Sequence, residues 1–269
     1  TFNFAMQWVE LNRESRNIKA VLQVGDIVDN NLHYQFKNIT NSLKSNLQSV
    51  PFFFAQGNHD VGIGGTALTR DTLYNKYFQP SISPLNEKAY GGSFASGEFE
   101  NSYYLLKSEK QNFLILLLEF SPRDEVIAWA NEIVARYPRH KAILVVHEYM
   151  DEISRISARD GIPTRSTAST PGSAHKYSVL TKNGRYFSKN SKNSGEDLWQ
   201  KLISKHSNFE FVFSGHHSDF DDSAAPQLKT GDGAAKSYRS DDIKSKKGIS
   251  RVHQFMFDSQ WIENGGDAW

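Results

Sequence analysis

Short apolar runs alternate with longer amphipathic stretches along most of this chain. Runs of about four to eight mainly apolar residues predict strands, and these are Lys19–Val24, Pro51–Ala55, Phe113–Phe120, Lys141–Val146 and Phe209–Ser214. Helices are predicted over Asn31–Leu47, Asp124–Arg136 and Glu196–Lys205. This alternation is typical of an α/β fold with parallel strands. Because ligands bind beyond the carboxyl ends of such strands, we expect the chemistry there.

The beginning of the chain reads as an amphipathic helix, with an apolar face that we expect to be formed by Phe4, Trp8, Val9 and Leu11. We expect one catalytic domain over residues 1–269, cut at both ends. Three segments are polar and irregular in pattern. They are Ala89–Glu100, which we expect to be a hairpin or a loop, Ser154–Asn193 and Asp219–Gly248. Loops of this length in a compact domain are usually functional or mobile.

Composition narrows the class of protein. The chain has 269 residues, of which 38% are hydrophobic and 13% aromatic, and this indicates a globular protein. The net charge of +1 gives the molecule no strong bias toward nucleic acid or a membrane surface. With no cysteine, disulfides and thiolate metal sites are excluded. No apolar run approaches the roughly 20 residues that a membrane span needs.

Four motifs rich in metal-binding residue types follow directly after predicted strands. They are Gly25-Asp26-Ile27-Val28-Asp29, Gly57-Asn58-His59-Asp60, Val146-His147-Glu148 and Ser214-Gly215-His216-His217. Taken singly, each has an ordinary explanation as a turn, a helix cap or a hydrogen-bonded histidine. Four such clusters at strand ends of one α/β chain are hard to obtain by chance. Their oxygen and imidazole ligands suit Mn, Fe or Zn.

The order Gly-Asp-x-x-Asp, Gly-Asn-His-Asp, His, Gly-His resembles the calcineurin-like metallophosphoesterase superfamily, from Lys19 to about Gln260. Finer features resemble a bacterial branch of it. These are Leu118-Glu119-Phe120, Pro122–Val126, Ala128-Trp129-Ala130, Val252-His253-Gln254 and Gly265-Gly266-Asp267. The resemblance implies two mixed β-sheets packed as a sandwich and flanked by helices. It also implies hydrolysis of a phosphate monoester or diester by a metal-activated water.

The resemblance assigns a role to each motif residue. Asp26 would bridge two metals, and the shell of the second metal would be completed by Asn58, His147 and His216. His59 would lie near the leaving group, as an acid or as a clamp on the phosphate, and Asp29 would orient it. One to two Mn, Fe or Zn ions per chain are implied.

Two departures from the superfamily pattern concern the first metal. The superfamily begins with a strand ending in Asp-x-His or Asp-x-Gln, and no such element precedes Thr1. The superfamily also commonly reads Gly-His-x-His, and Ser218 stands at the second His position. His217 is a poor substitute, because adjacent residues tend to point apart. We therefore expect this chain to hold one metal well and the other poorly.

Several alternatives stay open. The family resemblance implies a small phosphorylated substrate as the binding partner. Arg123 is a candidate for contact with its phosphate. Arg155–Lys192 carries eight basic residues against one acid, and either steers an anionic substrate or is an ordinary solvated loop. A nuclease would need a basic groove with stacking aromatics, which the neutral net charge disfavours.

A degenerate, non-catalytic phosphate- or metal-binding protein would account for Ser218 and the missing motif. Retention of Asp29 and His59 argues against it, because a binding protein has no need of a leaving-group acid. The resemblance leans toward the bacterial periplasm or the extracellular space. The substrate and the oligomeric state are left open.

Overall fold

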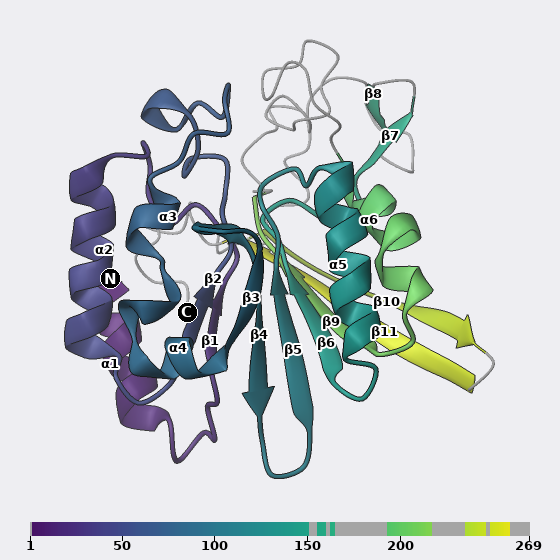
Figure 1. Cartoon of the computed structure of the whole chain (residues 1–269), viewed down its shortest axis with the longest axis horizontal. Helices are drawn as coiled ribbons and strands as arrows, with labels where there is room; N and C mark the ends of the chain where they lie inside the picture. The colour runs from purple at the N-terminus through teal and green to yellow at the C-terminus, as the bar shows by residue number, and fades with distance from the viewer. Residues whose placement is uncertain are drawn as a thin grey trace.

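The computed structural model describes residues 2–150, 155–159, 162–164, 193–216, 235–245 and 248–258. Within them, a seven-stranded mixed sheet has the order β10-β11-β9-β6-β5-β4-β3 (Figure 1). Its strands are β3 Tyr90–Ala95, β4 Glu98–Lys107, β5 Asn112–Leu117, β6 Lys141–Val145, β9 Phe209–Ser214, β10 Ala235–Ser245 and β11 Gly248–Asp258. The central strands β5, β6, β9 and β11 run parallel to their neighbours within this group. The strands β3, β4 and β10 are added antiparallel at the two sides.

A second, smaller sheet consists of β1 Val21–Gln23 and β2 Phe52–Phe54, which pair in parallel. Farther along the chain, β7 Ser157–Arg159 and β8 Ile162–Thr164 form a short antiparallel pair. The helices are α1 Phe2–Asn12, α2 His33–Asn46, α3 Tyr74–Tyr77, α4 Pro84–Ala89, α5 Asp124–Arg136 and α6 Gly195–Lys201. Short 3-10 helices cover Ile63–Gly65, Pro80–Ile82 and Ile203–Lys205.

Three apolar layers hold these elements together. Side chains of β2 such as Phe53 pack between the two sheets against Ile115 of β5 and Val145 of β6. A second layer joins α5 and α6 to the other face of the large sheet, and a third joins α1 and α2 to the small sheet. Figure 1 shows the same arrangement, with α5 and α6 over one face and α1 to α4 gathered around β1 and β2. The prediction of two packed sheets flanked by helices is confirmed. In the described part of the chain, the smaller sheet has two strands, both parallel.

Most predicted elements are confirmed to within a few residues. The bounds of α5 and β9 are those predicted, and the helix predicted over Glu196–Lys205 divides into α6 and a 3-10 turn. Ala89–Glu100 was expected to be a hairpin or a loop, and it forms the start of the β3–β4 hairpin. The polar segment Asp219–Gly248 was expected to be irregular, and this is wrong where β10 pairs with β11 along 11 residues. His217, Ser218, Gly265-Gly266-Asp267 and most of Arg155–Lys192 lie outside the described residues.

The prediction for the apolar face of α1 is wrong for three of its four residues. Phe4, Trp8 and Leu11 are 62%, 44% and 82% exposed, and the buried residues are Ala5 and Met6. The face that packs into the core is instead formed by Phe2, Ala5, Met6 and Val9, which recur at i, i+3, i+4 and i+7. On the polar side of the helix, Gln7 donates to Asn46 of α2, and Glu10 accepts from the backbone of Gln48 and Ser49. Among the described residues, no helix has both the length and the apolar character that crossing a membrane requires.

Candidate metal centre

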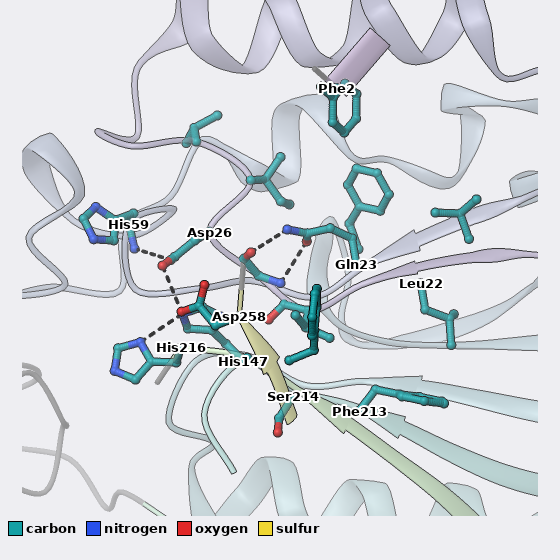
Figure 2. Close-up of a pocket in the computed structure, with 18 of the residues that line it drawn as sticks. Phe2, Leu22, Gln23, Asp26, His59, His147, Phe213, Ser214, His216 and Asp258 are labelled. Atoms are coloured by element: carbon teal, nitrogen blue, oxygen red, sulfur yellow. Dashed lines mark hydrogen bonds and ion pairs between the residues drawn. The ribbon is translucent and has the colours of Figure 1, made fainter. Parts of the chain in front are cut away.

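The four predicted ligand motifs meet at the carboxyl ends of four strands. Asp26 follows β1, Asn58 follows β2, His147 follows β6 and His216 follows β9. Figure 2 shows Asp26, His147 and His216 pointing toward one another, with His59 beside them. Segments that lie far apart in the sequence therefore supply one cluster of polar side chains.

The imidazole of His147 lies at the centre of this cluster. Its Nδ1 lies 2.7 Å from the backbone carbonyl of Val24, to which an Nδ1–H donates. Its Nε2 lies 3.1 Å from Asp26 Oδ2, 3.1 Å from Asn58 Oδ1 and 3.1 Å from His216 Nδ1. A histidine that ligates a metal usually donates its other ring N–H to a carbonyl in this way, which fixes its tautomer.

The chemistry of these atoms fits a bound cation. With the proton of His147 on Nδ1, the ring Nε2 and the oxygens of Asp26 and Asn58 face one another as lone-pair donors. Ligands that share one transition metal at about 2.0–2.2 Å lie roughly 3–3.5 Å apart, in line with the 3.1 Å separations. Asp26, His147 and His216 offer ligand atoms that all lie within 4.8 Å of one another. The residues therefore fit a cation of the Mn, Fe or Zn class.

Charge and burial shift the pKa values of this cluster. Burial lowers the pKa of His147, but the carboxylate of Asp26 and the Val24 carbonyl outweigh it and raise the pKa to about 9. Burial likewise raises the pKa of Asp26, and the neighbouring His147, His59 and His216 together bring it well below its usual range. Without a metal, a proton on His147 therefore supplies the positive charge that the cluster requires.

Two of the predicted ligand residues have an unusual backbone conformation. Asp26 has φ of 54° and His216 has φ of 74°, in the left-handed region that residues other than glycine seldom adopt. Such conformations cost on the order of 1–3 kcal/mol each and gather at functional sites. Their occurrence at two of the four predicted ligands is consistent with a site shaped for function.

Two glycines let the ligand loops approach one another closely. A Cβ on Gly57 would lie 2.2 Å from both the amide nitrogen and Oδ1 of Asp26. A Cβ on Gly25, whose φ is +108°, would lie 2.4 Å from Nδ1 of His147. Any side chain at either position would push the ligands apart.

Asp60 is a structural residue of the site to which the sequence analysis assigned no role. Its carboxylate is fully buried and accepts from the backbone N–H groups of Gly57, Ile27 and Val28 at 2.7, 3.2 and 3.0 Å. Burial and the nearby Asp26 raise its pKa to about 7, against the effect of these N–H donors. Asp60 thus fastens the loop after β1 to the loop after β2. The Asn-His-Asp motif includes Asp60, but the sequence does not indicate which N–H groups its carboxylate binds.

His59 and Asp29 are brought together at the edge of the cluster. Nδ1 of His59 lies 2.8 Å from the backbone carbonyl of Asp29 and 3.6 Å from its carboxylate. The backbone N–H of His59 donates to Oδ1 of Asp26 at 3.0 Å. The His59 side chain is 37% exposed and is one of the residues that line the pocket containing Asp26, His147 and His216. In this structure Asp29 contacts His59 mainly through its main chain.

Arg123 is engaged with acidic side chains. Its Nε and Nη2 donate to the two carboxylate oxygens of Glu119 at 2.9 and 3.2 Å, and its guanidinium lies 3.4 Å from Glu125. The group also lies over the ring of Phe94, at 5.6 Å from its centroid. The predicted contact of Arg123 with substrate phosphate stays a prediction.

A groove of about 820 Å³ leads away from the cluster (Figure 2). One wall comes from α1 and β1, including Phe2, Met6 and Leu22, and the other from Phe213 and Phe255 of the large sheet. Among the described strands, β1 pairs only with β2, and residues of β1 line this groove. Asp258, at the end of β11, also lines it, a position that the sequence analysis did not single out.

Comparison with known proteins defines the class. Residues 1–220 match the model of the calcineurin-like phosphoesterase family, and the chain belongs to that family. This confirms the resemblance drawn from the strand-end motifs. A relative in Bacillus subtilis (strain 168), named as the uncharacterized protein YvnB, is 25% identical over 271 residues. The match covers 100% of this chain and 17% of that relative, so the chain spans about a sixth of its length.

Proposed function

We propose that this chain hydrolyses a phosphate ester with the help of at least one divalent or trivalent transition metal ion. The observation that carries the proposal is the position of His147 Nε2, which faces Asp26, Asn58 and His216 at 3.1 Å each. Membership of the calcineurin-like phosphoesterase family supports metal-dependent phosphoester hydrolysis in general. A small phosphorylated molecule, monoester or diester, is the substrate class that we favour.

In this proposal Asp26, Asn58, His147 and His216 hold the cation. A bound cation of this class neutralises phosphate charge and lowers the pKa of a water molecule that attacks phosphorus. The carbonyl of Val24 keeps the His147 ring in the tautomer whose Nε2 faces the cluster. Phe120 packs against both imidazoles and shields that side of the cluster from water.

His59 is the residue that we assign to the leaving group. Nδ1–H of His59 donates to the backbone carbonyl of Asp29, which leaves Nε2 as the ring nitrogen available to a substrate. With that nitrogen protonated as well, the His59 imidazolium would donate to a phosphate oxygen, or transfer the Nε2 proton to the departing alcohol and become a neutral ring. Proton transfer by a positioned group contributes about 10²–10⁴-fold in rate.

The groove beside β1 is relevant to how the first metal would be bound. The family resemblance implies further ligands for that metal on a strand ending in Asp-x-His or Asp-x-Gln. The described residues offer Asp26 for this role, and the groove at the unpaired side of β1 has apolar walls of the kind that another strand would cover. We therefore propose that a second cation depends on ligands outside the described residues.

The test compares His59→Asn with the wild type. Both proteins, and the control His33→Asn at an exposed helix-end histidine that contacts Tyr77, are assayed with an aryl phosphate, a bis-aryl phosphate and added manganese. Metal content is measured by elemental analysis. We expect kcat of His59→Asn to fall about 10²–10⁴-fold while metal content and the control are unchanged. A wild type that binds metal without turnover of either ester would instead identify a non-catalytic binding protein.

A further inference from the structure

A buried carboxylate, Glu119, lies in the loop just after β5, next in sequence to Phe120. Glu119 is 2% exposed, and burial of a charge is costly unless it is fully paired. Arg123 grips both of its oxygens, and the side chain of Asn101 donates to Oε2 at 3.1 Å. Oε1 also lies 3.3 Å from Nη1 of Arg70, which comes from a different part of the chain.

Arg70 binds the main chain beside this carboxylate as well. Its Nη2 donates to the carbonyl of Ser121 at 2.9 Å, and its Nη1 donates to the carbonyl of Phe120 at 3.3 Å. Arg70 belongs to the connection between β2 and α3, which begins with the loop of Asn58. One guanidinium therefore joins the loop after β2 to the loop after β5.

The loop after β5, to which Arg70 is bonded, carries Phe120, whose ring packs against the predicted ligands His147 and His216. Phe120 is fully buried, and its ring centroid lies 5.8 Å from that of His147 and 5.7 Å from that of His216. Phe120 also packs with Val61, next in sequence to the Asn58 loop. A shift of the Phe120 backbone would move the surface against which both imidazoles rest.

We infer that Arg70 is a positioning residue for the metal centre, acting through Glu119 and the Phe120 main chain. This inference rests on the proposed function. The guanidinium fork bonds a carboxylate and two carbonyls at once, which fixes the loop after β5 relative to the loop of Asn58. Arg123 completes the pairing of Glu119 from the other side. Hydrogen-bonding partners of metal ligands typically affect metal affinity about 10–100-fold when they are replaced, and we take the same range for Arg70, which acts on His147 and His216 through Phe120.

The variant Arg70→Lys distinguishes a positioning role of Arg70 from a role in neutralising the charge of Glu119. A lysine ammonium keeps the positive charge beside Glu119, but it lacks the planar fork that reaches three acceptors in fixed directions. Arg70→Lys therefore keeps the buried carboxylate neutralised while it releases the carbonyls of Phe120 and Ser121. The matched control is Arg251→Lys, which alters an exposed arginine paired with Asp242 on the β10–β11 hairpin.

The experiment measures Mn²⁺ affinity by calorimetry, the thermal unfolding midpoint and the separate values of kcat and KM. We expect Arg70→Lys to unfold near the wild-type midpoint and to bind Mn²⁺ about 10–100-fold more weakly. Saturating Mn²⁺ should restore most of kcat, and Arg251→Lys should match the wild type in every measurement. Wild-type Mn²⁺ affinity in a folded Arg70→Lys protein would overturn the inference.

Phe120→Leu provides a second test that leaves Arg70 and Glu119 in place. It replaces the ring that packs against His147 and His216 with a smaller side chain. If Arg70 acts through Phe120, this variant should also weaken Mn²⁺ binding. If Arg70→Lys does not fold, wild-type affinity in Phe120→Leu overturns the inference. If the wild type binds Mn²⁺ but hydrolyses no ester, only the proposed function is refuted. The comparisons of Mn²⁺ affinity still test the role of Arg70.

Discussion

Metal binding should strengthen as the pH rises, because a proton on His147 competes with the cation for the same nitrogen. In the metal-free protein the pKa of His147 is raised to about 9, and a metal binds only the neutral ring. Below that pH, each bound cation should therefore release a proton. The apparent affinity should rise about tenfold for each pH unit, or about 100-fold between pH 6.5 and 8.5.

The stability of the metal-free protein should change in the opposite direction. The folded-state pKa of His147 of about 9 lies above the ordinary value of 6.5, so its proton stabilises the folded state. This contribution is fully present below pH 6.5 and is lost as the pH rises through 9. At about 1.4 kcal/mol for each pH unit, the loss amounts to roughly 3 kcal/mol of unfolding free energy.

Calorimetric titration with Zn²⁺ or Mn²⁺ in buffers of different ionisation enthalpy counts the released protons, and urea unfolding with a chelator measures the stability. His147→Gln should abolish the pH dependence that this ring contributes. The control His253→Gln, at a half-buried histidine bonded to the hydroxyl of Tyr238, should retain it. Metal affinity that does not vary between pH 6.5 and 8.5, with no proton release, would refute the reasoning.

Two further substitutions test the packing of the ligand loops. Gly57→Ala places a Cβ at 2.2 Å from Asp26, and we expect loss of metal binding with a fall of about 1–3 kcal/mol in unfolding free energy; normal zinc binding would contradict this. Asp60→Ala leaves three buried backbone N–H groups without their acceptor, and should lower the unfolding free energy by about 2–4 kcal/mol in denaturant titration. An unchanged midpoint would show that Asp60 does not fasten the two loops.

The position of the cluster could be predicted because its signals are local in the sequence. Asp26, Asn58, His147 and His216 each follow a short apolar run, and the carboxyl ends of parallel strands meet at one edge of a fold. The helix Asp124–Arg136 was predictable for a similar reason, since its apolar period and acidic first turn lie within its own residues.

Other features depended on partners far away in the sequence. For α1 two apolar stripes compete, and the one that packs against α2 and β2 is Phe2, Ala5, Met6 and Val9, a choice that depends on where those elements lie. The strand β10 carries charges at neighbouring positions, including Asp241 and Asp242, and its pairing with β11 supplies the order that its own pattern lacks. Arg70 gave no signal at all, because its three acceptors lie about 50 residues downstream.

The direction of the Arg123 side chain is a further feature that could not be predicted from the sequence. A basic residue after a strand end is a reasonable phosphate contact from sequence alone. In the fold, Glu119 lies four residues earlier on a loop that turns back, and both of its oxygens reach the guanidinium. Which anion an arginine meets is decided by loop geometry, and the sequence pattern does not contain that geometry.

The account depends most directly on one cation being shared by four side chains. Crystals of the protein grown with Zn²⁺, with diffraction data collected on either side of the zinc absorption edge, would locate that cation. We predict an anomalous peak within about 2.0–2.3 Å of Asp26 Oδ2, His147 Nε2 and His216 Nδ1, with Asn58 Oδ1 completing the shell. Zinc peaks elsewhere in the molecule, and none between these residues, would contradict the account.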